Sequence, residues 1–361
     1  MSLVASFVRY PLHFTFTART SRGSMTLRDT WLLRVHDKKN PEKIGWGECS
    51  PLIGLSIDDR PDFAKYLDKT CRHVEEYEMP QSEEEVNAMA YALLPSDFPS
   101  IRFGLQTALL DLMHGAERQI FPSDFSKKGK PIPINGLIWM DGKEAMMKQA
   151  EEKLAQGYTT IKLKVGALNL QDELDVLAYI RAIGGAKIVI RIDANGAFAP
   201  DQALAILEKF QQYSIHSVEQ PIRKGQLKEM KEICAYSPIS VALDEELIGC
   251  HGLENKRALL DATSPYALIL KPSLLGGYRS CREWIQLAAE RKMDWWLTSA
   301  LESNIGLNAI SQFAATFSNP LPQGLGTGQL YKNNFASPLE VKNGEITYLN
   351  SKNWDLRVLH A

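Results

Sequence analysis

Five charged residues recur at nearly equal intervals through the middle of the chain, each after a short apolar run: Lys164, Asp193, Glu219, Asp244 and Lys271. The intervals are 25 to 29 residues, about the length of one strand and the helix that follows it. Residues that end successive parallel strands project from the same edge of a barrel, where such folds keep their sites. The spacing therefore predicts that two lysines and three carboxylates converge on one site.

Lys162 stands two positions before Lys164, in the stretch 158–166 (YTTIKLKVG). Residues two apart on a strand point to the same side, so both ammonium groups are expected in one place. Alone, this pair would be ordinary for an exposed edge strand, and a single Asp or Glu after a strand often caps the next helix. Five charged strand ends in phase are hard to obtain by capping, so we favour a functional site.

The three carboxylates indicate the chemistry of this site. Converging carboxylates repel one another unless a cation lies between them, and an all-oxygen set without His or Cys favours Mg²⁺, with Mn²⁺ as the second choice. A divalent cation beside lysines suits a small carboxylate substrate whose negative charge grows in the transition state. Nearby cations, including Lys162 and Lys271, would lower the pKa of a lysine base. The predicted step is removal of a proton α to a carboxylate, which gives an enediolate.

The elements that must position these residues alternate between strands and helices. We expect strand ends within residues 137–139, 161–164, 188–193, 217–219, 241–244, 268–271 and 296–299, with a weaker one near 324–326. Between them lie helical patterns, such as residues 143–156, 170–183, 201–212, 226–236 and 279–291. About eight such repeats predict a closed parallel barrel. An open doubly wound sheet is the alternative, disfavoured because no G-x-G-x-x-G follows the first strand.

The first third of the chain has a different pattern. Residues 12–17, 30–35 and 45–48 alternate as in an antiparallel meander. Residues 60–117 then become helical, and the apolar run 103–113 predicts a buried helix. This order of strands followed by helices predicts an α+β unit. We expect loops at residues 19–25 and 51–55, both of which would order over bound product, and a linker at residues 123–130.

Composition narrows the class of protein. The 361 residues are 45% hydrophobic and 23% charged, and the formal net charge is −2 without a long run of one sign, so neither a nucleic-acid footprint nor a membrane-surface patch is indicated. No run of about 18 apolar residues suggests a membrane span. The five cysteines are scattered without a C-x-x-C, which argues against a disulfide framework and a structural zinc site. With no convincing signal peptide, we expect a soluble, cytoplasmic protein. The seven histidines show no pairing and receive no role.

The charged strand ends belong to short motifs that resemble those of the enolase superfamily, muconate-lactonizing subgroup. These motifs are Lys162-x-Lys164, Asp193-Ala-Asn195, Val218-Glu219-Gln220-Pro221, Leu243-Asp244-Glu245 and Leu270-Lys271-Pro272. The resemblance implies an α/β fold, a (β/α)7β-type modified TIM barrel with an α+β capping domain. We accordingly expect a capping domain at residues 1–122, a catalytic barrel at 123–330, and a C-terminal tail at 331–361 that returns to the capping domain.

Within the superfamily, the chain is most similar to the o-succinylbenzoate synthases of menaquinone biosynthesis. The supporting stretches are residues 134–138, 298–303 and 324–327, and the last reads Gly-Leu-Gly-Thr where dipeptide epimerases usually carry Asp-x-Asp. This resemblance implies a lyase. Its reaction would be the Mg²⁺-assisted syn-dehydration of 2-succinyl-6-hydroxy-2,4-cyclohexadiene-1-carboxylate to o-succinylbenzoate through an enediolate.

The resemblance also implies roles for the charged residues. The three carboxylates, Asp193, Glu219 and Asp244, would bind Mg²⁺. Lys164 would remove the α-proton and then protonate the departing hydroxyl. Lys271 would lie across the ring, stabilising the anion as a cation over a π-face, and Lys162 would support the substrate carboxylate and Lys164.

Three further residues would contact substrate. Arg191 stands two residues before Asp193 and would meet substrate directly or through water, Asn195 would also bind substrate, and Ser299 would help to hold the succinyl arm. Other activities stay open. An N-succinylamino acid racemase would use the same two lysines as paired acid and base, a cycloisomerase of the same superfamily is a further option, and a non-catalytic ligand-binding barrel is the alternative from another class. The oligomeric state stays open as well.

Overall fold

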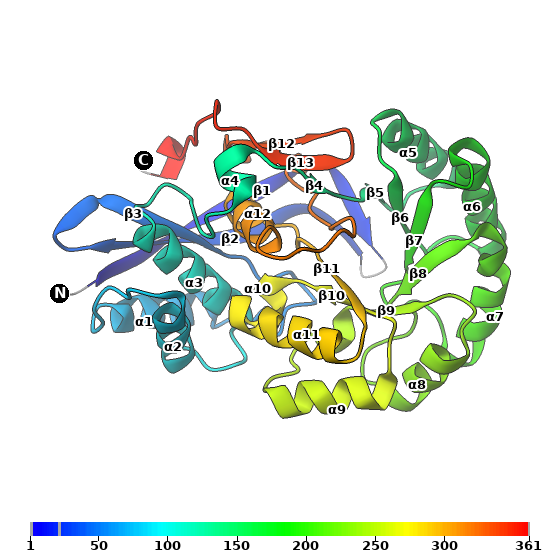
Figure 1. Ribbon diagram of the computed structural model, residues 1–361, viewed down its shortest axis with the longest axis horizontal. Coiled ribbons are helices and arrows are strands. Elements are labelled where there is room, and N and C mark those ends of the chain that lie inside the picture. Colours follow the sequence, from blue (N-terminus) through cyan, green and yellow to red (C-terminus); the bar gives the residue numbers. More distant parts are fainter. Residues whose placement is uncertain (1–2, 21–22, 360–361) are drawn as a thin grey trace.

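The computed structural model describes residues 3–20 and 23–359, and Figure 1 shows an antiparallel sheet beside a larger sheet ringed by helices. The chain begins with an antiparallel meander of strands β1 (Leu3–Thr20), β2 (Gly23–Asp37) and β3 (Asn40–Cys49). Helices α1 (Phe63–Val74), α2 (Glu83–Leu93) and α3 (Pro99–Met113) follow. The predicted order of strands and then helices is therefore confirmed for the first third of the chain.

Helix α3 packs directly on β3 and is buried along nearly its whole length. Two glycines permit this approach, because a Cβ on Gly47 would lie 1.8 Å from the carbonyl oxygen of Gly104. The backbone of the helix thus lies against the backbone of the sheet, and the predicted buried helix at residues 103–113 is confirmed. We refer below to β1–β3 and α1–α3 together as the cap.

The larger sheet consists of seven parallel strands in sequence order. They are β5 (Gly136–Ile138), β6 (Thr160–Lys164), β7 (Val189–Asp193), β8 (Ile215–Glu219), β9 (Val241–Leu243), β10 (Ala267–Leu270) and β11 (Asp294–Leu297). Gln323 and Gly324 close the ring, because they form parallel bridges to Ile134 before β5 and to Thr298 after β11. Sequential order and closure confirm the predicted (β/α) barrel, and the doubly wound alternative is wrong.

Helices separate the strands, as the alternating pattern predicted (Figure 1). They are α5 (Lys143–Ala155), α6 (Leu170–Gly184), α7 (Pro200–Phe210), α8 (Leu227–Tyr236), α9 (Leu253–Thr263), α10 (Pro272–Leu275), α11 (Tyr278–Glu290) and α12 (Asn304–Ala314). Their start points follow local chemistry: the side chain of Asn169 caps α6, that of Ser303 caps α12, and Pro200 opens α7. None of the helices within the described residues is long and apolar enough to span a membrane.

Two expectations about connections are wrong. The linker expected at residues 123–130 contains the short helix α4 (Asp124–Lys128), whose buried Phe125 packs edge-on against Tyr348, 6.1 Å between ring centroids. The loop expected at residues 19–25 is a continuation of the β1–β2 hairpin, because Ala18 pairs with Met25 and Thr20 with Gly23. Strand pairing prevailed over the polar composition from which the loop was predicted, and residues 21 and 22 of that stretch lie outside the described residues.

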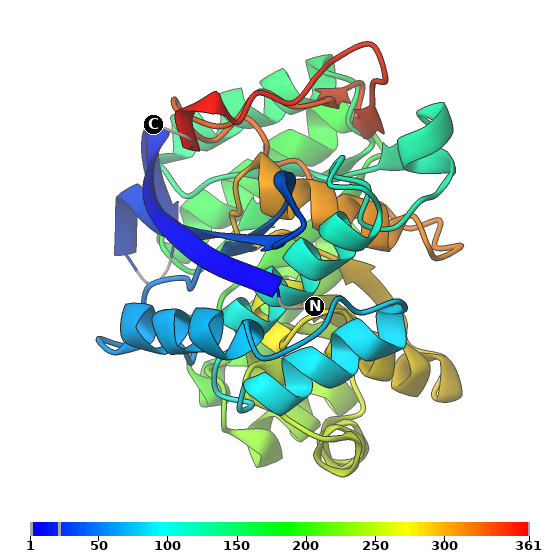
Figure 2. The same ribbon diagram turned by 90° about the vertical axis from the view of Figure 1, so that its left-hand side faces the viewer.

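The C-terminal part of the chain lies along the cap, and Figure 2 shows it (red) beside the N-terminal strands (blue). Tyr331 bridges Phe14 of β1, and Phe335 belongs to a cluster with Leu32 and Trp46. Strands β12 (Leu339–Lys342) and β13 (Glu345–Tyr348) then form a small sheet with β4 (Ile132–Pro133). These contacts support the return of the tail to the cap, while the division at residues 122 and 330 stays our proposal.

A buried carboxylate joins the cap to the barrel. Glu48 of β3 accepts hydrogen bonds from the backbone N–H groups of Ser303 (2.9 Å) and Gly306 (3.0 Å) at the start of α12. The first N–H groups of a helix have no partner within the helix and carry partial positive charge, so a carboxylate there is stabilised. Arg28 of β2 donates to the carbonyl of Ala300 in the same region. The cap is thereby fixed against the loop that follows β11.

Candidate active site

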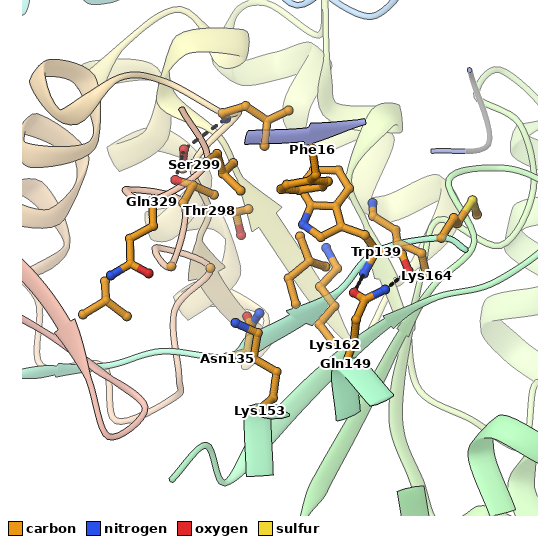
Figure 3. A pocket seen from close by; sticks show the side chains of 18 of the residues that line it. Phe16, Asn135, Trp139, Gln149, Lys153, Lys162, Lys164, Thr298, Ser299 and Gln329 are labelled. Carbon is orange, nitrogen blue, oxygen red and sulfur yellow. Dashed lines mark hydrogen bonds between the residues drawn. The ribbon is translucent and has the colours of Figure 1, made fainter. Parts of the chain in front are cut away.

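A cavity of about 750 Å³ lies where the barrel strands end, beneath the cap (Figure 3). Phe16 of the cap and, from the loop between β3 and α1, Leu52 and Leu55 contribute to its lining. Of the residues predicted from the sequence, five line this cavity: Lys162, Lys164, Asn195, Lys271 and Ser299. The cavity thus lies at the carboxyl ends of the strands, the end of the barrel predicted to carry the site.

The three acidic strand ends bind the three lysines directly. The ammonium nitrogen of Lys162 is 2.8 Å from Asp193 Oδ2 and 2.6 Å from Glu219 Oε2. The ammonium nitrogen of Lys164 is 2.6 Å from the same Asp193 oxygen. On the other side of the site, Lys271 forms an ion pair with Asp244. The structure thus brings these six charged groups to one end of the barrel, as a group of four around Asp193 and a separate pair of Lys271 with Asp244.

The three lysines differ in their proton affinity. Burial works against the charge of each, but Asp193 and Glu219 together outweigh it at Lys162, and Asp244, Glu219 and Glu245 together outweigh it at Lys271, so both pKa values are raised. At Lys164 burial prevails over the attraction of Asp193, with repulsion from Lys162 adding to it, and the pKa is lowered. Lys164 is therefore the lysine of the three that loses its proton most readily.

The carboxylates suit a divalent cation in donor type, charge and burial. All three are buried, and burial, reinforced by nearby Asp193, raises the pKa of Glu219 to about 8. Glu219 Oε1 is buried and has no hydrogen-bond partner among the described residues. Within residues 3–20 and 23–359, however, no three acidic, His or Cys side chains are already grouped around a common point for a metal. Their oxygens are instead directed at lysine ammonium groups.

Two amide side chains brace this cluster from left-handed backbone positions. Asn195 (φ 45°) accepts a hydrogen bond from Lys164 at 2.7 Å and donates one to Glu245 at 3.0 Å. Gln220 (φ 41°) accepts from the backbone N–H groups of Asp244 and Glu246, both at 3.2 Å. Asn195, expected to bind substrate, thus also orients Lys164. Gln220 was missed, although it directly follows Glu219 in a motif that drew attention to its neighbour.

Arg191 lies below the cavity and is not among the residues that line it. Its guanidinium carbon is 3.8 Å from the ring centroid of Trp296, and it donates to the carbonyl of Pro322 at 2.8 Å. Burial lowers its pKa to about 10. A residue two positions before a strand end shares its face but lies one layer nearer the amino end of the barrel. The position of Arg191 therefore does not support the predicted contact with substrate.

Ser299 lines the cavity, but its hydroxyl is committed to protein groups. It donates to Glu302 Oε2 at 2.6 Å and accepts from the backbone N–H of Leu301 at 3.0 Å and from Thr327 Oγ1 at 2.9 Å. A hydroxyl has one hydrogen to donate, so Ser299 supports the wall more than it offers a donor. The neighbouring Thr298 Oγ1, which has no partner among the described residues, lines the same cavity and was not singled out from the sequence.

The part of the β1–β2 hairpin around Phe16 and Arg19 contacts residues that follow the first barrel strand, β5. The ring of Phe16 meets that of Trp139 edge-on, 5.4 Å between centroids, and Arg19 pairs with Asp141 at 2.8 Å. Trp139 is itself held by Gln149, whose side-chain oxygen accepts from the backbone N–H of Trp139 at 2.8 Å (Figure 3). The β1–β2 hairpin therefore covers this side of the cavity, a role that we expected of a loop at residues 19–25.

Comparisons with known proteins show the family and the fold of the chain. Residues 145–351 match the family described as enolase C-terminal domain-like. The chain is 43% identical to an o-succinylbenzoate synthase of Desulfotalea psychrophila, a match that covers 94% of this chain and 97% of that protein. The crystal structure of MenC from Desulfotalea psychrophila superposes with a TM-score of 0.84 at 40% identity, and covers 96% of this chain and 100% of that one.

A more distant structure shares the fold. The dipeptide epimerase from Cytophaga hutchinsonii, solved in complex with Mg and the dipeptide D-Ala-L-Val, has a TM-score of 0.83 to this chain at 21% identity. The match covers 100% of this chain and 98% of that one. Cap and barrel together therefore recur in proteins of low sequence identity.

Proposed function

The chain belongs to the enolase superfamily, and we propose that it catalyses its reaction with a divalent cation held by Asp193, Glu219 and Asp244 and with Lys164 as the base. The activity is that of an o-succinylbenzoate synthase, a carbon–oxygen lyase. The observation that carries the division of roles is the position of Lys164. It reaches the cavity beside Lys162, and its pKa is lowered where those of the other two lysines are raised.

The substrate is 2-succinyl-6-hydroxy-2,4-cyclohexadiene-1-carboxylate, and the reaction removes a proton from C1 and hydroxide from C6. The neutral amine of Lys164 takes the C1 proton, and the electron pair of the broken C–H bond is delocalised into the adjacent carboxylate as an enediolate. The electrons then form the C1–C6 double bond while the C6–O bond breaks. The ammonium of Lys164 returns the proton to the departing hydroxyl, so that water leaves. One residue can serve both steps because the dehydration is syn.

Lys271 and Lys162 stabilise the developing charge. Lys271 directly follows β10, which is four strands away from β6 in the sheet, and it pairs with Asp244 across the site from Lys164. It would face the opposite side of the ring as a cation over the π-system. Lys162, fixed between Asp193 and Glu219, would support the substrate carboxylate and disfavour the charge on Lys164.

A bound divalent cation supplies Lewis-acid stabilisation of the substrate carboxylate. We propose Mg²⁺, with Mn²⁺ as an alternative, because the three donors are carboxylate oxygens. Cation binding would also satisfy the buried Glu219 Oε1, which lacks a partner among the described residues. We place the reaction in the cytoplasm because all five cysteines are free thiols, as is usual in a reducing compartment.

The test is a spectrophotometric assay of aromatisation with purified protein and Mg²⁺, beside a polarimetric assay on N-succinylamino acids. We expect dehydration that stops on chelation and returns with Mg²⁺. Racemisation is the second candidate activity, because lysines approach the site from two opposite strands, β6 and β10. Racemisation without dehydration would replace the proposed reaction. If the protein shows neither activity, it is a binding protein.

A further inference from the structure

The cavity has a side arm that leaves the barrel between its first and eighth strand positions. Residues Asn135, Tyr158 and Gly326 line it there, and Lys153 of α5 and Asn343 of the β12–β13 turn line it farther out. Gln323 and Gly324 close the ring there through bridges and backbone hydrogen bonds to residues on both sides. The cavity nevertheless extends from the catalytic lysines to the space between α5 and the C-terminal hairpin, because residues of both regions line it.

Lys153 is the half-buried lysine of this arm. Its ammonium nitrogen is 3.4 Å from Gln156 Oε1 and 5.2 Å from the ring centroid of Tyr158, and no carboxylate among the described residues lies within ion-pair distance. The catalytic lysines, by contrast, are each bound to a carboxylate of the site. Lys342, at the outer end of the arm, is exposed. Lys153 thus carries a positive charge on the cavity wall that Glu152, which lines the same cavity, attracts without forming an ion pair.

Asn135 provides a second, independent observation. It is 5% exposed and lines the cavity, and its side-chain N–H₂ is a donor that suits a carboxylate. Figure 3 shows the Lys153 side chain extending toward Asn135. Gly136 permits this approach, because a Cβ there would lie 3.2 Å from Lys153 Cδ and 3.0 Å from Tyr158 Cγ. A cation and an amide donor therefore share one end of the cavity.

We propose that Lys153 and Asn135 form a carboxylate-binding subsite for the distal end of the succinyl arm. This inference rests on the proposed function, since that substrate carries two carboxylates and only one of them can occupy the metal site. An ammonium and an amide N–H suit a carboxylate, and charge-assisted hydrogen bonds of this kind are the strong ones. Ser299, the residue expected to hold the arm, has already donated its hydrogen to Glu302.

The test measures binding, by calorimetry in the presence of Mg²⁺, of o-succinylbenzoate and of 2-butanoylbenzoate, which replaces the distal carboxylate by a methyl group. We expect the wild type to prefer the dicarboxylate by about 10- to 100-fold, the usual effect of one charge-assisted contact. Lys153→Gln should remove most of that preference. Lys148→Gln, at an exposed lysine of the same helix, is the matched control and should keep it.

Asn135→Asp is a second variant that changes few atoms. It places a negative charge beside the proposed carboxylate, and should weaken binding of o-succinylbenzoate at least 10-fold while leaving 2-butanoylbenzoate within about 3-fold. An unchanged preference in both Lys153→Gln and Asn135→Asp, or no preference in the wild type, would overturn the subsite. A wild type that dehydrates its substrate but fails these binding tests refutes the subsite alone, whereas an inactive wild type refutes the proposed function.

Discussion

Lys162 and Lys164 share one carboxylate oxygen, because both ammonium nitrogens lie within 2.8 Å of Asp193 Oδ2. Two cations that share one anion compete for it. Lys162 has Glu219 as a second partner and its pKa is raised, whereas burial lowers the pKa of Lys164 and repulsion from Lys162 adds to this effect. The two lysines thus differ in proton affinity although their side chains point to the same side of one strand.

The first prediction concerns Lys164. Lys164→Ala should lower kcat by about 10²- to 10⁴-fold, the usual contribution of a positioned acid–base group. Circular dichroism should show an unchanged fold, and calorimetry should show retained Mg²⁺ binding. A variant that keeps more than about 1% of wild-type kcat would exclude Lys164 as the base.

The second prediction concerns the metal site. Glu219→Gln should weaken Mg²⁺ binding at least 10-fold, because it removes one of three charged oxygen donors. Mg²⁺ should raise the Tm of the wild type, since a ligand that binds only the folded state stabilises it, and this rise should shrink in Glu219→Gln. Calorimetry and thermal scans with and without a chelator measure both effects. Wild-type affinity in this variant would remove Glu219 from the ligand set.

The third prediction concerns stability and pH. Asp58 is fully buried, and burial raises its pKa to about 6 despite two hydrogen bonds from Ser100. The folded protein therefore holds this proton more tightly than the unfolded chain, in which the pKa of Asp is about 3.9. The contribution of Asp58 to the free energy of unfolding is greatest below about pH 4 and is lost as the pH rises to about 6, by roughly 1–3 kcal/mol.

Asp58→Asn should abolish this dependence. Its amide oxygen can still accept from Ser100, while the other carboxylate oxygen has no partner among the described residues to lose. Urea unfolding at several pH values measures the difference between variant and wild type. Asp201→Asn, at an exposed position, is the control and should follow the wild-type profile. A constant difference between Asp58→Asn and wild type from pH 4 to 7 would contradict the assignment.

The fourth prediction concerns the cover of the cavity. Hydrogen exchange in the hairpin tip around Phe16 and in residues 51–55 should slow when o-succinylbenzoate binds, because both segments line the cavity. Phe16→Ala removes the contact with Trp139 and should raise KM several-fold with a smaller change in kcat. Val8→Ala, at a similarly exposed position of the same strand, should leave both constants unchanged. If hydrogen exchange in these segments is the same with and without product, they do not close over the bound product.

The fifth prediction concerns Ser299 and Glu302. Ser299→Ala should destabilise the protein by about 1–3 kcal/mol, because it leaves an oxygen of the buried Glu302 without its donor. In a Glu302→Gln background the same substitution should cost less, since no buried charge is then stranded. Denaturant midpoints of the four proteins give the coupling. Additive effects would show that Ser299 is free of Glu302 and available to substrate.

The sequence by itself determined the order of the elements and the residues that end the barrel strands. Short apolar runs followed by a charge recur at the length of one repeat, and both properties are local, so Lys164, Asp193, Glu219, Asp244 and Lys271 could be assigned to one site without coordinates. The face of a strand residue follows from its position, because side chains alternate.

Only the tertiary structure decided how deep each side chain lies in the barrel, which groups it contacts, and which segments cover the cavity. The alternation of side chains along a strand predicts the face on which Arg191 lies but not its depth in the barrel. In the structure its guanidinium group stacks on Trp296, below the cavity. The commitment of Ser299 to Glu302 and the unpaired charge of Lys153 depend on which neighbours fill each hydrogen-bonding position. The contact of Glu48 with Ser303 joins residues 255 positions apart. Such contacts form between elements that only folding brings together, so no local pattern in the chain encodes them.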